Sequence, residues 1–199
     1  MDTKLKRILA QLNLANQLTF LRLVLIPFFI LALLHGRFEL AFVLFGVAAL
    51  TDLLDGISAR MLGGTQLGAY LDPAADKLLL FTAFIMLTDY PVMLQSIPYV
   101  ARIPLWFTVL TISRDVLIVA VALLLYLGRS QTRFPPSIWG KLTTAMELIT
   151  VSCFLLANWL GVDYLILQPL IWCSLALILV SGFHYLWRTI QEISRHVSS

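Results

Sequence analysis

Long apolar stretches separated by short polar or proline-containing breaks dominate the chain. A helix needs about 20 mostly apolar residues to cross a bilayer. The pattern predicts six such helices, at about residues 17–35, 38–61, 67–88, 105–127, 137–159 and 165–187. We therefore expect an all-α integral membrane protein with six transmembrane helices, in which residues 1–199 form a single domain.

Residues 1–16 follow a different pattern. Basic residues at positions 4, 6 and 7 accompany apolar residues at positions 5, 8, 9 and 12. This spacing places the apolar side chains on one helix face. It predicts a short amphipathic helix that lies on the membrane surface ahead of the first span.

The composition strengthens the membrane assignment. Hydrophobic residues make up 60% of the chain, charged residues 13%, and the mean hydropathy is +0.89, which is far more apolar than a soluble domain. The net charge of +3 is small and the basic residues form no stripe, so no nucleic-acid partner is expected. Cys153 and Cys173 lie in apolar runs without metal-ligand spacing and are interpreted as small buried hydrophobic residues.

Four aspartates interrupt the apolar pattern between residues 51 and 77. Asp52 and Asp55 share one helix face, and Asp72 and Asp76 share a face of the next helix, after a break that contains two glycines. A carboxylate at membrane depth costs about 2.5–3.5 kcal/mol, and like charges at close quarters repel unless cations lie among them. Hard divalent cations with oxygen ligands, such as Mg²⁺ or Mn²⁺, are therefore expected.

The neighbours of these aspartates favour a phosphate-bearing ligand. Gly56 and Gly68 lack side chains beside the carboxylates, and Arg60 lies one turn beyond Asp55, where it could hold a phosphate. Salt-bridged helix ends are an alternative, but the nearby bases are too few. A cation channel or transporter is another, although its carboxylates would follow a pore axis across several spans.

The acidic segment resembles the signature of the CDP-alcohol phosphatidyltransferases. All eight signature positions match with the family's spacing: Asp52, Asp55, Gly56, Ala59, Arg60, Gly68, Asp72 and Asp76. The resemblance implies transfer of a phosphatidyl group from CDP-diacylglycerol to an alcohol, with release of CMP. It also implies two divalent cations, Mg²⁺ or Mn²⁺, held by the four aspartates.

The same resemblance assigns further roles. Asp76 doubles as the general base for the acceptor hydroxyl, and the pocket for the cytidine diphosphate is formed by Asp52, Asp55, Gly56, Ala59, Arg60 and Gly68. No Ser/His/Asp nucleophile set is apparent in the sequence, so we expect direct in-line displacement without a covalent intermediate.

Three shorter elements bear on the acceptor. The segments that contain Arg22, Arg114 and Lys141 resemble elements of phosphatidylglycerophosphate and cardiolipin synthases. Together with Arg133 these residues are expected to form a basic pocket for a phosphate-bearing, glycerol-based acceptor. Glycerol 3-phosphate is preferred because that activity is common among short chains of this family. Phosphatidylglycerol is the alternative, because Ser113-Arg114-Asp115 is closest to eukaryotic-type cardiolipin synthases.

The sequence leaves several pairings open. Arg114 and Asp115 form either a neutralising pair or part of the site, and Lys77 pairs with an acid or with a lipid phosphate. Glu147 is within reach of either Lys141 or Arg114. Arg22 either snorkels to the interface or contributes to the site.

The loops predict the orientation. An even number of spans puts both termini on one side, and most basic residues at helix ends fall on that side. The positive-inside rule then places the termini and the acidic site in the cytoplasm. No signal or transit peptide is evident, which favours a bacterial plasma-membrane protein. The resemblance also implies a homodimer.

Overall fold

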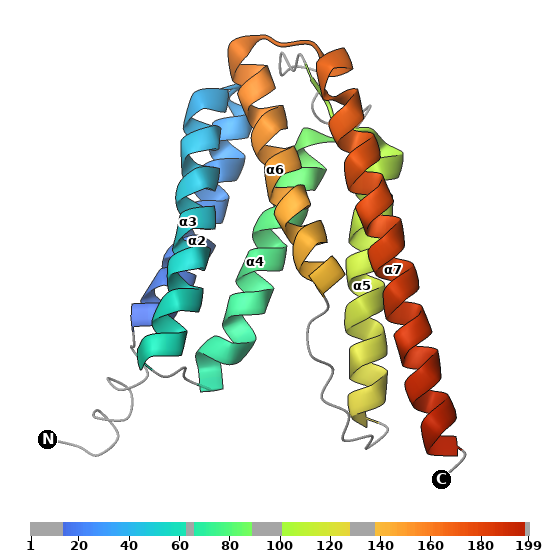
Figure 1. The fold of residues 1–199 in the computed structure, drawn as a ribbon. Coiled ribbons are helices and arrows are strands. Elements are labelled where there is room, and N and C mark those ends of the chain that lie inside the picture. The colour runs from blue at the N-terminus through green and yellow to red at the C-terminus, as the bar shows by residue number, and fades with distance from the viewer. Residues whose placement is uncertain (1–13, 63–65, 89–100, 128–137, 198–199) are drawn as a thin grey trace, which may run out of the picture.

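The computed structural model describes residues 14–62, 66–88, 101–127 and 138–197. For residues 14–16, 53–62, 66–73, 122–127, 189 and 192–197 it gives the backbone alone. The described part is all-helical apart from one isolated bridge between two residues, as the hydrophobic pattern predicts. Its elements, labelled in Figure 1, are α2 (Leu14–Leu34), α3 (Phe38–Leu62), α4 (Gln66–Leu87), α5 (Leu105–Leu127), α6 (Ile138–Leu160), η1 (Tyr164–Leu167) and α7 (Gln168–Val197).

The long helices match the six predicted segments, except that α7 continues ten residues past the predicted end at 187. The prediction stopped where the apolar run stopped. The following residues are more polar but include no proline or glycine, so the helix continues. The predicted surface helix at 1–16 lies almost wholly outside the described residues, since α2 begins at Leu14.

Three described segments are long and apolar enough to cross a membrane, namely Gln17–Leu34, Ile138–Leu160 and Tyr164–Arg188. This supports an integral membrane protein. That all six long helices cross the bilayer stays a prediction.

The helices form an elongated bundle (Figure 1). Helix α2 packs against α3 and α4, α6 packs against α3 and α7, and α5 packs more extensively against α7 than against α4. The turn between α2 and α3 needs the positive φ of 67° that Gly36 adopts. Helix α2 begins and α7 ends at the same end of the bundle, and the α2–α3 turn and η1 lie at the other end, which we call the turn end.

The apolar core lies in the half of the bundle near the turn end. Its largest members are aromatic residues from five helices that are at most 1% exposed: Phe29, Phe45, Phe84, Phe107 and Phe154. The rings of Phe29 and Phe45 lie 5.9 Å apart, and those of Phe84 and Phe107 lie 6.1 Å apart. The aspartates lie farther along the same helices, so apolar packing and charged residues occupy different halves of the bundle.

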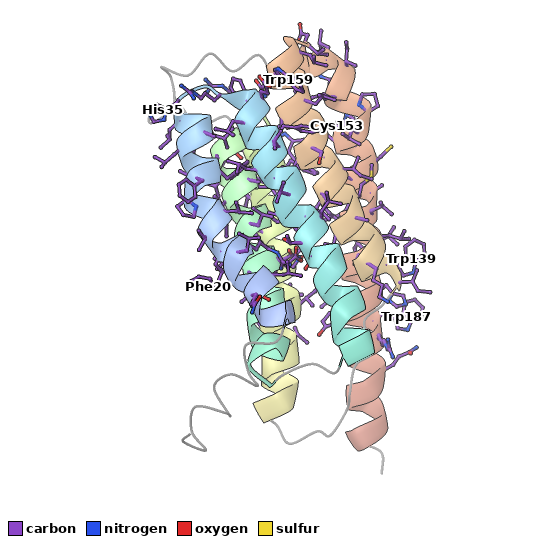
Figure 2. All side chains as sticks on the ribbon, turned by 90° about the vertical axis from the view of Figure 1, so that its left-hand side faces the viewer. Phe20, His35, Trp139, Cys153, Trp159 and Trp187 are labelled. Atoms are coloured by element: carbon purple, nitrogen blue, oxygen red, sulfur yellow. The ribbon has the colours of Figure 1, made fainter. Side chains whose placement is uncertain are left out.

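The outer surface is apolar and carries tryptophans at two levels. All five tryptophans are exposed. Figure 2 shows Trp159 near the turn end and Trp139 and Trp187 toward the opposite end. Two such levels are typical of the aromatic belts at membrane interfaces. The expectation that both cysteines are buried is wrong for Cys173, which is exposed, because apolar residues of a membrane helix also face outward.

At the turn end, a buried asparagine links α6 to the segment that precedes α5. Asn158 of α6 accepts a hydrogen bond from the Ala101 N–H at 3.1 Å and donates one to the Ala101 carbonyl at 2.7 Å. Close by, the Ile103 N–H donates to the Leu87 carbonyl at 2.8 Å. The residues before α5 are thereby held against both α4 and α6.

We predict that Asn158→Leu lowers the thermal stability of the purified protein. Both backbone groups of Ala101 would lose their partner, and a buried unsatisfied polar group costs about 1–3 kcal/mol. In a chain of this size each kcal/mol shifts Tm by about 2–4 °C. Thermal unfolding in detergent measures the effect against Leu160→Ala, whose side chain is 62% exposed. Equal Tm values for the two variants would contradict the assigned role.

Candidate active site

Helices α3 and α4 carry the acidic motif, and α3 ends at Leu62 while α4 begins at Gln66. The predicted arrangement of two helices joined by a short break is therefore confirmed. Side chains are described for Asp52 and Asp76. The remaining motif residues lie on the described backbone of these helices, but their side chains fall outside the description: Asp55, Gly56, Ala59, Arg60, Gly68 and Asp72.

An ion pair joins α2 to the first aspartate of the motif. Arg22 Nη2 lies 3.1 Å from Asp52 Oδ1. The Arg22 side chain is 0% exposed, whereas Asp52 is 38% exposed. The snorkelling alternative for Arg22 is therefore wrong, because its guanidinium points into the bundle. Asp52 has an internal cation on one side and remains accessible on the other.

Asp76 lies in the same electrostatic neighbourhood. It is half-buried on α4. The charges that act on its carboxylate are those of Asp52, Lys77, Arg22 and Asp115. The structure thus brings one aspartate from each half of the motif close enough for their charges to interact.

A second set of charges lies on the other side of Asp76. Lys77 donates a hydrogen bond to Asp115 Oδ2, and its Nζ lies 3.9 Å from Glu147 Oε2. Arg114 Nη1 donates to Asp115 Oδ1 at 2.6 Å, and Arg114 Nη2 donates to Ser181 Oγ. We call these five residues the charge cluster; they come from α4, α5, α6 and α7.

The charge cluster bears on three pairings that the sequence left open. Arg114 contacts Asp115, which leaves a role of either residue in the site a prediction, and Lys77 pairs with an acid. The cation within 4 Å of Glu147 in the described part is Lys77, which the sequence did not suggest, while the charge of Arg114 also acts on Glu147. A carboxylate in an apolar helix signals that a cation is near. Which cation it is depends on how the helices pack.

The proposed acceptor residues are only partly described. Arg22 and Arg114 are engaged as above, Lys141 is exposed in the first turn of α6, and Arg133 lies outside the described residues. The structure therefore does not test whether these four form one pocket.

The donor chemistry suits a hard cation, because Asp52 and Asp76 supply carboxylate oxygens from two neighbouring helices. Among the side chains that the structure describes, no group of three or more acidic, histidine or cysteine residues could hold a metal ion. The other two predicted ligands, Asp55 and Asp72, fall outside that set.

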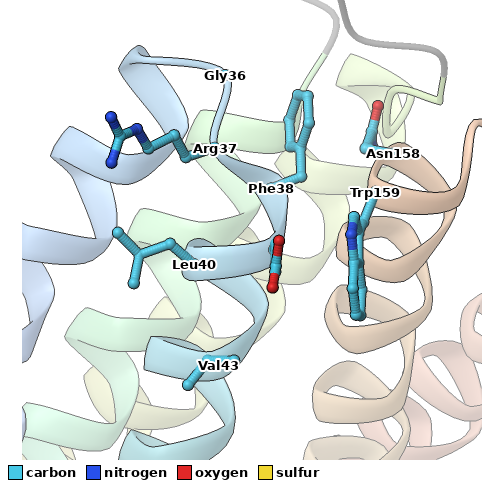
Figure 3. Close-up of a pocket in the computed structure, with 8 residues that line it drawn as sticks. Gly36, Arg37, Phe38, Leu40, Val43, Asn158 and Trp159 are labelled. Carbon is cyan, nitrogen blue, oxygen red and sulfur yellow. The ribbon is translucent and has the colours of Figure 1, made fainter.

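Two hollows in the described part bear on where the chemistry could take place. The larger, about 730 Å³, lies at the turn end between the start of α3 and the end of α6, where Phe38 and Trp159 border it (Figure 3). Along α3 this hollow is remote from the acidic motif, so we do not assign the chemistry to it. The smaller, about 280 Å³, lies between α4 and α5 with Lys77, Phe81 and Asp115 in its lining.

The apolar helices and the acidic motif define an integral membrane enzyme. The chain belongs to the CDP-alcohol phosphatidyltransferase family, whose sequence model matches residues 12–180. It is 35% identical over 190 residues to a probable phosphatidylglycerophosphate synthase of Mycobacterium tuberculosis, covering 91% of this chain and 83% of that protein.

Two further relatives carry related names. The CDP-diacylglycerol–glycerol-3-phosphate 3-phosphatidyltransferase of Bacillus subtilis is 31% identical, covering 87% of this chain and 93% of that protein. The CMP-forming cardiolipin synthase of Homo sapiens is 30% identical, covering 89% of this chain and 63% of that protein. The resemblance read from the motif is therefore confirmed, and the chain is a phosphatidyltransferase.

We predict that Arg22→Met destabilises the protein more than Arg37→Met. The first substitution leaves Asp52 without its buried cation, whereas Arg37 is exposed. Breaking a fully buried pair costs about 3–5 kcal/mol, and the partial exposure of Asp52 reduces this to about 1–3 kcal/mol. Thermal unfolding in detergent measures the difference, and Arg22→Lys is expected to fall between wild type and Arg22→Met. Identical Tm values for the two methionine variants would count against the pairing.

Proposed function

We propose that this phosphatidyltransferase is a metal-dependent phosphatidylglycerophosphate synthase. It transfers the phosphatidyl group of CDP-diacylglycerol to glycerol 3-phosphate and releases CMP. The proposal rests chiefly on the complete acidic motif on α3 and α4, whose described aspartates lie in one electrostatic neighbourhood beside a buried arginine. The names of the bacterial relatives point to the same acceptor.

Asp52, Asp55, Asp72 and Asp76 would hold two divalent cations, Mg²⁺ or Mn²⁺. When bound, such ions neutralise the charge of a pyrophosphate and stabilise a leaving phosphate. Arg60 and the small residues Gly56, Ala59 and Gly68 would shape the pocket for the cytidine diphosphate, together with Asp52 and Asp55.

Asp76 would accept the proton of the acceptor hydroxyl as the hydroxyl oxygen attacks the phosphorus that bears the diacylglycerol. The bond between that phosphorus and the bridging oxygen breaks, and CMP leaves with the bridging oxygen. The step is a direct in-line displacement, so no covalent enzyme intermediate forms. A positioned base contributes about 10²–10⁴-fold to such a reaction.

The phosphate of the acceptor would bind basic residues at the site, for which we propose Arg22, Arg114, Arg133 and Lys141. Of the three described ones, Lys141 is the most exposed and opens helix α6, a favourable place for an anion. Arg114 already has Asp115 and Ser181 as partners, so its contribution depends on how these hold its guanidinium.

A cardiolipin synthase is the second candidate, with phosphatidylglycerol as acceptor. The observation that favours it is the Ser113-Arg114-Asp115 segment, together with the human relative. The alternative of a cation channel or transporter loses its support, because the matched family is one of transferases.

We further propose that all six long helices cross a bacterial plasma membrane, with both termini and the site on the cytoplasmic side. The shared end of α2 and α7 in Figure 1 and the basic residues near helix ends support this orientation. As implied by the family resemblance, we propose a homodimer.

The proposal predicts that purified protein releases CMP from CDP-diacylglycerol when glycerol 3-phosphate is added. Phosphatidylglycerol, tested in the same preparation, is expected to be a poor acceptor. Asp76→Asn should lower kcat by at least about 100-fold, because the base is lost. The matched control is Asp163→Asn, which makes the same change at an exposed position before η1. Full activity of Asp76→Asn would refute the assigned base, and preference for phosphatidylglycerol would favour the second candidate.

Metal removal gives an independent test. Protein treated with EDTA is expected to release no CMP until Mg²⁺ or Mn²⁺ is added back. The same ions should raise its Tm, since a ligand that binds only the folded state stabilises it. Asp52→Asn should weaken that stabilisation. Unchanged activity in EDTA would contradict the metal requirement.

A further inference from the structure

The charge cluster is buried and balanced. The side chain of Glu147 is 1% exposed, that of Asp115 is 3% exposed and that of Arg114 is 9% exposed, whereas Lys77 is 29% exposed. Counted at their formal charges, the cations Lys77 and Arg114 balance the acids Asp115 and Glu147. Four charges from three helices thus compensate one another inside an apolar bundle.

Stability alone does not account for such a cluster. A buried ion pair is often no more stabilising than apolar residues of similar volume, because removing charges from water is costly. A buried pair does restrict the orientation of its two side chains, since each charged group must face its partner. Helix α5 packs only thinly against α4, so the contact of Lys77 with Asp115 is a main link between them.

The orientation of Lys77 is important because Lys77 is the neighbour of Asp76 in the chain. It directly follows Asp76, and adjacent residues on a helix point about 100° apart. Lys77 reaches α5 and α6, while the neighbours of Asp76 include Arg22 on α2 and Asp52 on α3. Holding Lys77 therefore adds to the packing of α4 against α2 a directional contact on the other side of Asp76, and so restricts the rotation of α4 about its axis.

Small rotations have large effects at a reacting centre. A side-chain atom about 5–6 Å from the helix axis moves about 1 Å when the helix turns by about 10°. A misplacement of about 1 Å can cost about 10²-fold in rate. The two oxygens of Asp115 are engaged by two different cations, Lys77 at Oδ2 and Arg114 at Oδ1. This leaves the carboxylate little freedom to swing.

We propose that Asp115 is a positioning residue for the transfer reaction: it holds Lys77, with Glu147 behind it, and thereby aims Asp76 toward the Arg22–Asp52 pair. The proposal rests on the proposed role of Asp76. Ser181 extends the support to α7 through Arg114. Asp115 itself touches no reacting atom in this scheme.

Steady-state kinetics of CMP release, with CDP-diacylglycerol and glycerol 3-phosphate varied separately, test the proposal. We predict that Lys77→Met and Asp115→Asn each lower kcat by about 10–100-fold. Lys77→Met, which leaves the Arg114–Asp115 pair in place, should keep the KM for glycerol 3-phosphate within about twofold. The kcat of the double variant should be no lower than that of the less active single variant, because both substitutions break the same link. Asp115→Glu should recover part of kcat.

A matched control separates positioning from stability. Thr88→Val removes the buried 2.6 Å contact with Thr108 at the turn end. It should lower Tm without changing kcat. If a variant with one charge removed does not fold, the double variant Lys77→Met/Asp115→Leu is tested in its place. It removes one charge of each sign, so the formal charges of Arg114 and Glu147 still balance. A low kcat in that folded variant supports the proposal.

Other results overturn it. A wild-type kcat in the folded double variant would show that the link does not aim Asp76. A loss in Lys77→Met that appears mainly in the KM for glycerol 3-phosphate would mean that Lys77 binds the acceptor phosphate instead of positioning Asp76. If the wild type releases no CMP with either acceptor, the proposed function itself is refuted, and the positioning role falls with it. If the wild type is active and all variants match it, only the positioning role fails.

Discussion

The structure depends on one constraint, which is that a charge inside an apolar bundle must lie beside an opposite charge. Three of the four described acids in the middle of the bundle are accounted for in this way. Asp52 lies against Arg22, Asp115 accepts from both Lys77 and Arg114, and Glu147 is near Lys77. Asp76 lies among these charges. The helices that carry the motif are therefore joined to their neighbours by ion pairs next to the motif.

This arrangement separates two tasks along the bundle. Aromatic packing and the Asn158 contacts hold the helices together near the turn end. Toward the other end, ion pairs join α2 to α3 and α4 to α5. Apolar contacts are non-directional, whereas ion pairs are directional, so each half uses the interaction that suits its task.

Much of this could be predicted from the sequence, because the signals are local. Apolar runs of sufficient length gave the helices, and eight residues at fixed spacing gave the family. The partners of the buried charges could not be predicted, because they come from helices distant in the chain. Lys77 and Asp115 are 38 positions apart, and Lys77 is not among the partners that the sequence suggests for Glu147. The end of α7 was also missed, since a helix can outlast its apolar run.

The placement of the aromatic core has a consequence for how such enzymes diversify. The aromatic core lies away from the acidic motif, so substitutions around the motif need not unfold the chain. Relatives named for glycerol 3-phosphate transfer and for cardiolipin synthesis match nearly the same stretch of this sequence. A scaffold that keeps its cohesion apart from its chemistry gives evolution freedom to exchange one alcohol for another.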